Sequence, residues 1–188
     1  MYLPTSFAVL KATVGLTRNK IEKKLLVRFS YRYRLAKSFQ YTCAPEVGRT
    51  LAGYDAILKL FLAYTAYEQA LKPAVRLNVF GILPVDKNQI LDKGLAQRLR
   101  SNVKLMNFLV NYSTDENLIK KVGEFVNGSC NDITRVAYAI RNVYAHGDLT
   151  SSAIGLSTHK QQDVLWDLAH FLLSYSDDVF TKCVEKLR

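Results

Sequence analysis

The stretch LAGYDAILKLFLAYTAYEQALK, residues 51–72, decides the fold class that the sequence predicts. Apolar and aromatic residues occupy most sides of this stretch at 3.6 residues per turn, which is typical of a helix buried nearly all round. Pro73 follows directly, and because proline lacks an N–H donor and restricts the residue before it, we expect the helix to end there. The sequence therefore predicts a long helix that is the most buried element of the protein.

Apolar residues recur every three or four positions on both sides of this stretch, so further helices are expected. They are predicted at about residues 17–40, 87–111, 113–128, 132–146 and 158–183. In residues 74–86, Val75, Leu77 and Val79 alternate with polar residues as in a short strand, and we assign the segment to a connection. The sequence predicts an all-α protein, a bundle of about five or six helices in one domain, residues 1–188.

Residue types that cap helices support these boundaries. The predicted N-terminal caps are Asp86, Asn131 and the capping-box pairs Ser113 with Glu116 and Thr158 with Gln161, and the predicted C-terminal stops are Gly128 and Gly147. The segment from 132 to 146 is bounded on both sides, by Asn131 and by Gly147. We therefore take its last residue, His146, as the end of a helix.

The chain carries a formal net charge of +10, and this charge is concentrated near its start. Residues 1–50 contain ten Lys and Arg against two Glu. A segment of this kind predicts a polyanionic partner, either nucleic acid or an anionic membrane surface. No apolar run reaches the roughly 18 residues of a membrane-spanning helix, and the first residues do not resemble a secretory signal, so we expect a soluble, cytoplasmic protein.

Several classes of site are not indicated by the sequence. Cys43, Cys130 and Cys183 lie far apart and form no CxxC or Cys/His cluster, so neither a disulfide framework nor a structural zinc site is expected. The sequence has no P-loop and no dinucleotide-binding fingerprint. We therefore expect no cofactor and no bound metal.

The predicted helix at 132–146 carries the residues with the most chemical interest. Tyr138, Asn142 and His146 follow one another at intervals of four, on the side opposite the apolar stripe of Ile133, Val136, Ile140 and Tyr144, and Arg141 lies at the margin of this ridge. We expect the ridge to face solvent, a cleft or a partner. His146 would lie at the helix end, where the helix dipole and the unpaired carbonyls favour a cation.

The residues Arg141-Asn142-Val143-Tyr144-Ala145-His146 resemble the signature of the HEPN (higher eukaryotes and prokaryotes nucleotide-binding) family. That signature has Arg, a small polar residue, a short spacer and His, late in a helix of a helical bundle. The resemblance covers about seven residues including Gly147, together with a compatible order of helices, and so short a motif is moderately specific.

The resemblance implies metal-independent RNA cleavage by two protomers that bring their motifs together in one cleft. His146 would act as general acid or base, Arg141 would bind the scissile phosphate, and Asn142 would orient one of them. The implied partners are RNA, a second copy of the chain, and a regulatory protein or antitoxin. Members that are neutralised by nucleotidyl transfer have a Tyr two residues after the His, and Asp148 at this position argues against such regulation.

A basic row on the predicted helix 17–40 is the candidate RNA-binding surface. Lys20, Lys24, Arg28 and Arg32 recur every four residues, and Tyr31 and Tyr33 interleave with them as candidates for base stacking. An ordinary solvated basic face is the structural alternative. For the whole protein, the alternative to an RNA-cleaving or RNA-binding function is a non-catalytic helical interaction or dimerisation module that uses the surface of Arg141, Asn142 and His146.

Overall fold

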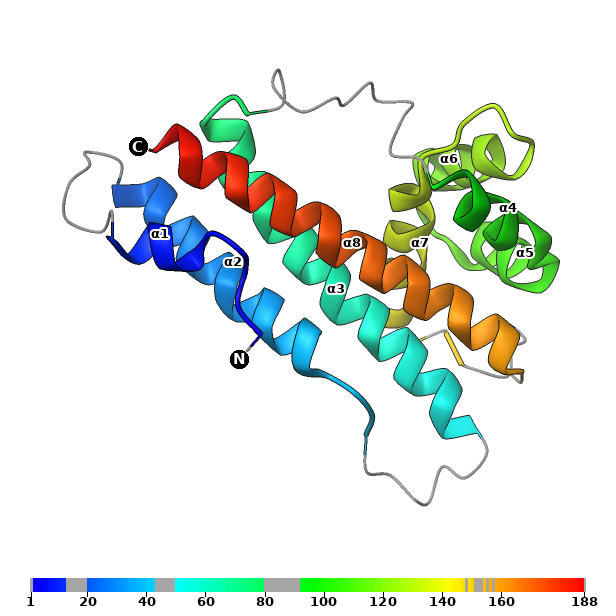
Figure 1. Ribbon diagram of the computed structural model, residues 1–188. Helices are drawn as coiled ribbons and strands as arrows, with labels where there is room; N and C mark the ends of the chain where they lie inside the picture. The colour runs from blue at the N-terminus through cyan, green and yellow to red at the C-terminus, as the bar shows by residue number, and fades with distance from the viewer. Residues whose placement is uncertain are drawn as a thin grey trace. The chain divides into compact units, whose positions relative to one another are not determined.

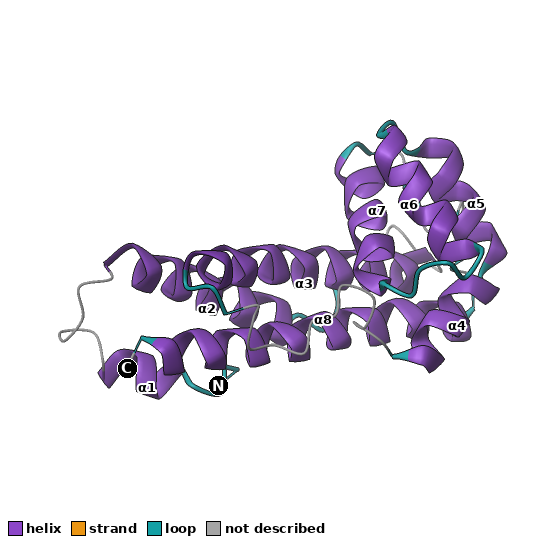
Figure 2. Ribbon diagram, turned by 90° about the horizontal axis from the view of Figure 1, so that it is seen from above, coloured by secondary structure: helices purple, strands orange, loops and turns teal. Residues whose placement is uncertain are grey.

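The computed structural model describes residues 2–12, 20–42, 50–79, 92–147, 149–150, 154, 156 and 158–187. All regular secondary structure in these ranges is helical (Figure 2), which confirms the all-α prediction. The helices are α1 (Phe7–Ala12), α2 (Lys20–Ser38), α3 (Leu51–Arg76), α4 (Lys93–Ser101), α5 (Val103–Tyr112), α6 (Glu116–Val126), α7 (Ile133–Ala145) and α8 (His159–Lys186).

The described residues form eight helices rather than the five or six expected. The short helix α1 was not predicted, and the helix expected at 87–111 is divided at Asn102 into α4 and α5. Asn102 has a non-helical backbone, and its Oδ1 accepts a hydrogen bond from the Leu105 N–H at 3.2 Å, so it caps the start of α5. The N-cap predicted at Asp86 lies outside the described residues. Helix α4 begins after Asp92, whose Oδ1 accepts a hydrogen bond from the Leu95 N–H.

Two compact units make up the chain. Unit 1 comprises Met1–Phe39, Leu62–Val85 and His170–Arg188, and unit 2 comprises Gln40–Phe61 and Asp86–Ala169. The long helices α3 and α8, labelled in Figure 1, each contribute one part to each unit. The single domain expected from the sequence stays a prediction.

Although α3 and α8 have 26 and 28 residues, no helix in the described ranges is apolar enough along its length to cross a membrane.

In unit 1, α2 packs through aromatic residues against the C-terminal part of α8. Phe29 is fully buried, with its ring centroid 5.1 Å from that of Phe180 on α8. Leu26 on the same helix is also fully buried, whereas Ile21 is 57% exposed. Burial raises the pKa of the Cys183 thiol to about 12, so this cysteine stays protonated at neutral pH.

Helix α3 does not end at Pro73, as the sequence predicted, but continues to Arg76. The proline removes one backbone donor, and the loss is small because the helix ends within one further turn. The Leu77 N–H still donates to the Pro73 carbonyl at 2.9 Å, and Asn78 then leaves the helix with a φ of 49°. The alternation at residues 75–79 therefore belongs to a helix end and a turn rather than to a strand or an irregular connection.

In unit 2, two buried polar side chains of α3 have partners of their own. Asp55 is 6% exposed, and its Oδ1 accepts hydrogen bonds from the Thr42 N–H at 2.9 Å and the Thr42 hydroxyl at 2.8 Å. Lys59 is 2% exposed, and its ammonium lies 5.3 Å from the centroid of the Trp166 ring. A buried cation is costly unless other groups replace its hydration, and the ring face contributes to that replacement.

The predicted helix stops are confirmed, whereas two predicted N-caps are wrong by one or two residues. Gly128 and Gly147 have φ values of 81° and 83°, the left-handed conformation that ends many helices. The caps of α6 and α7 are Asp115 and Asp132 rather than Ser113 and Asn131. In both helices an aspartate oxygen, which accepts more strongly than a neutral group, bonds to N–H groups of the first turn.

Candidate functional site

Helix α7, which carries the HEPN-like motif, is held in unit 2 by its apolar side. Ile133, Val136, Ala137 and Ile140 are buried, as the sequence predicted. Tyr144, predicted for the same stripe, is half-buried, and Val143 is buried in its place. The Tyr144 ring contacts Phe61 of α3 edge-on, with centroids 5.6 Å apart.

His146 caps the C-terminus of α7. Its N–H donates to the Asn142 carbonyl at 3.1 Å, and the Gly147 N–H donates to the Tyr144 carbonyl at 3.0 Å. Because Gly147 has a positive φ, the chain turns away directly after His146, and the His146 side chain is exposed. The last carbonyls of α7 lie at this end, where the helix dipole favours a cation.

Arg141 and Asn142 are joined by a hydrogen bond one turn before the helix end. The Arg141 Nη1 donates to the Asn142 Oδ1 at 2.9 Å, and both side chains are half-buried. This contact limits the directions in which the guanidinium can point. A guanidinium carries its N–H donors in a rigid planar fork, a geometry that matches a phosphate group.

The three motif residues thus share the last turns of α7, although the expected outward ridge is only partly exposed. Tyr138 and Asn142 are half-buried, whereas His146 is exposed. A side-chain hydrogen bond joins Arg141 to Asn142, and His146 is linked to Asn142 through the backbone. An imidazole and a guanidinium therefore lie within six residues of each other at one helix end.

The basic row lies on α2, in unit 1. Lys20, Lys24, Arg28 and Arg32 are all exposed, as a nucleic-acid-binding face requires. The Arg32 Nη1 also donates to the Thr65 carbonyl of α3 at 3.3 Å. Of the two tyrosines proposed for base stacking, Tyr31 is 66% exposed, but Tyr33 is 5% exposed and packs beside Phe29. The prediction that Tyr33 stacks on bases is therefore wrong.

Within the described ranges, no group of three or more His, Cys, Asp or Glu side chains is arranged so that it could hold a metal ion. Cys130 and Cys183 are buried free thiols in different units, and Cys43 lies outside the described residues. His159 is exposed at the first turn of α8. The chemistry that the described site offers directly is that of imidazole, guanidinium and amide groups.

The sequence matches no protein-family model, and its comparison with curated proteins and with solved structures also finds no match. The resemblance to the HEPN family consequently depends on the motif residues of α7 and on the helical fold.

Proposed function

We propose that this protein binds RNA and cleaves it without a metal ion, using the HEPN-like residues at the end of α7. The observation that carries the proposal is the hydrogen bond from Arg141 to Asn142, one turn before the exposed cap residue His146. It supports a division of roles in which Asn142 orients the guanidinium, Arg141 binds phosphate and His146 transfers a proton.

The proposed reaction is an internal phosphoryl transfer. The ribose 2′-oxygen attacks the neighbouring phosphorus, the bond to the 5′-oxygen of the next nucleotide breaks, and the products are a 2′,3′-cyclic phosphate and a 5′-hydroxyl. His146 removes the proton of the 2′-hydroxyl or donates one to the leaving oxygen, and the other proton transfer uses water or a second group. Arg141 stabilises the charge on the non-bridging oxygens.

We further propose that two copies of the chain form the active assembly. One histidine cannot serve efficiently as both base and acid in the same step, whereas two copies of the motif supply two histidines and two arginines. A regulatory protein or antitoxin that covers the same helix end would then block cleavage. The rival proposal is a non-catalytic helical module that dimerises or binds a partner through this end of α7.

Analysis of the reaction products tests the proposed chemistry. Purified protein incubated with mixed RNA in EDTA should produce fragments with 2′,3′-cyclic phosphate and 5′-hydroxyl ends, because the 2′-oxygen is the nucleophile and no metal takes part. The ends are identified by their resistance to phosphatase and by mass spectrometry. Fragments with 5′-phosphate ends, or cleavage that requires magnesium, would contradict the mechanism. Specific RNA binding without cleavage would favour the non-catalytic alternative.

The basic row on α2 should supply the salt-dependent part of RNA affinity. Changing both Lys24 and Arg28 to Gln should make the slope of log affinity against log salt shallower by about 1 to 1.5, since each lost phosphate contact on a single strand contributes about 0.7. The affinity is measured by fluorescence anisotropy at several salt concentrations. The control variant carries Gln at two exposed lysines of unit 2, Lys93 and Lys120, and should keep the wild-type slope. An equal change of slope in both variants would show that only overall charge matters.

A further inference from the structure

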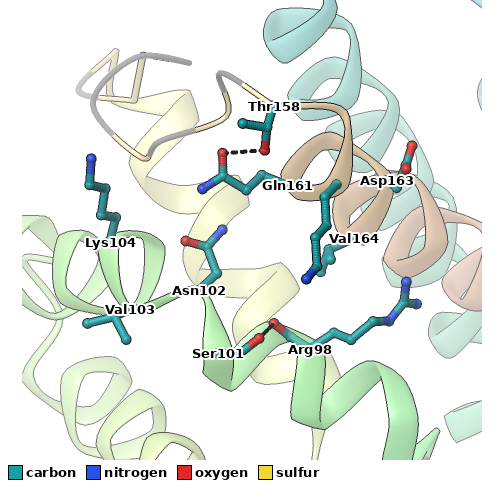
Figure 3. Close-up of a pocket in the computed structure, with 10 residues that line it drawn as sticks. Arg98, Ser101, Asn102, Val103, Lys104, Thr158, Gln161, Asp163 and Val164 are labelled. Atoms are coloured by element: carbon teal, nitrogen blue, oxygen red, sulfur yellow. Dashed lines mark hydrogen bonds between the residues drawn. The ribbon is translucent and has the colours of Figure 1, made fainter.

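A pocket of about 580 Å³ lies in unit 2, apart from the motif residues of α7. It is bounded by the end of α4 and by the starts of α5 and α8 (Figure 3). The volume is within the range of about 300 to 1,000 Å³ that is usual for small-molecule sites, and it exceeds what a single inorganic ion fills.

The charged side chains around the pocket are mostly cationic. Arg98, Lys104 and Lys160 line it, and Asp163 is the one acidic residue in the described lining. Arg98 already pairs with Asp167, with an N–O distance of 2.6 Å, whereas Lys104 and Lys160 extend from the first turns of two helices. The lining therefore favours an anion.

Two helices begin at this pocket. The first turns of α5, which starts at Val103, and of α8, which starts at His159, adjoin it. The first N–H groups of a helix have no partner inside the helix, and the positive end of the helix dipole lies there. Two such ends at one pocket add to the attraction that the lysines exert on an anion.

The buried amide of Asn102 points to a bound hydrogen-bond acceptor. Asn102 is 9% exposed, and while its Oδ1 accepts from the Leu105 N–H, its Nδ2 has no hydrogen-bond partner among the described residues and is shielded from solvent. The Oε1 of Gln161 likewise accepts from the Thr158 hydroxyl at 2.9 Å, so the amide nitrogens of Asn102 and Gln161 face the same space (Figure 3). Two donors cannot bond to each other, whereas an acceptor between them would satisfy both.

We propose that this pocket binds a small organic phosphate ester. The oxygens of a fully ionised phosphate only accept hydrogen bonds. They would accept them from the amide nitrogens of Asn102 and Gln161 and would pair with the ammonium of Lys160. The organic part would lie against the apolar side chains of Val103 and Val164, which line the same pocket. This site is independent of the proposed RNA cleavage, since none of its residues belongs to the motif of α7.

Calorimetric titration of the full chain with phenyl phosphate, inorganic phosphate and phenol tests the proposal. We expect phenyl phosphate to bind more tightly than inorganic phosphate, since the ring adds apolar contact, and phenol not to bind. Asn102→Asp keeps the oxygen that caps α5 but replaces the donor by an anionic oxygen, and should weaken phenyl phosphate binding by about tenfold or more. Lys160→Gln, at an exposed position, should also weaken it.

The matched control is Lys120→Gln, an exposed lysine of α6 in the same unit, which should leave binding unchanged. Circular dichroism and thermal melting establish that each variant is folded, and Lys160→Gln tests the site even if Asn102→Asp fails to fold. Tighter binding of inorganic phosphate than of phenyl phosphate would limit the site to a free ion and overturn the ester proposal. Binding that persists in both pocket variants, or its absence in the wild type, would overturn the site itself.

Discussion

His146→Ala is expected to lower the rate of RNA cleavage by about 10²- to 10⁴-fold, the contribution typical of a positioned proton-transfer group. Helix content and melting temperature should stay close to the wild-type values. The side chain is exposed, and its backbone bond to the Asn142 carbonyl is available to alanine as well. Loss of activity would therefore report on the imidazole rather than on folding.

The rates are compared by following labelled RNA under single-turnover conditions. His159→Ala is the matched control, because His159 is also exposed, belongs to the same unit and lies at a helix terminus, so it should leave the rate unchanged. Arg141→Ala should lower both the rate and the affinity for RNA, because the guanidinium is assigned to the phosphate. Undiminished cleavage by His146→Ala would reject this mechanism and point to another site or a contaminating nuclease.

The sequence predicted helices well where apolar periodicity and capping residues agree. It failed to predict a helix boundary where one side chain interrupts a helix although the apolar periodicity continues. Apolar residues continue through Asn102 at helical spacing, from Leu99 to Met106, so the pattern indicates one helix. The break arises because the Asn102 side chain competes for a backbone N–H and starts a new helix. Pro73 is the converse case, since a proline that costs one bond near a helix end does not stop the helix.

For the candidate site, the sequence predicted where the motif residues lie on the helix but not how their side chains are oriented. Gly147 and the period of α7 were enough to predict that His146 lies at a helix end. The bond between Arg141 and Asn142 depends on side-chain rotamers, which neither spacing nor composition determines. The pocket of Asn102 and Gln161 was missed, because its walls come from segments almost 60 residues apart and each residue alone is an unremarkable polar group.

Arg100 lies at the junction from which α7 starts, and its replacement should have the largest effect on stability of the changes considered. The Nε donates to the Phe125 carbonyl at the end of α6 at 2.7 Å, and Nη2 donates to the Cys130 carbonyl at 2.8 Å and the Asn131 Oδ1 at 2.6 Å. The guanidinium carbon also lies 4.6 Å from the centroid of the Phe125 ring. One side chain thus bonds to a carbonyl in the last turn of α6 and to two groups of the segment that connects α6 to α7.

Arg100→Met is expected to lower the free energy of unfolding by about 2 to 4 kcal/mol, because hydrogen bonds to a charged donor contribute about 1.5 to 3 kcal/mol and the carbonyls left behind are partly buried. Arg98→Met on the same helix is the matched control and should cost less than about 1 kcal/mol, since the Arg98–Asp167 pair is 45% exposed on both sides. Urea denaturation followed by circular dichroism measures both. If the two variants lost equal stability, the contacts of Arg100 would not be what fixes the start of α7. If Arg100→Met loses more stability than Arg98→Met, as expected, the rate of RNA cleavage by Arg100→Met should also fall at temperatures where the protein is still folded. The reason is that the position of His146 depends on how α7 is held.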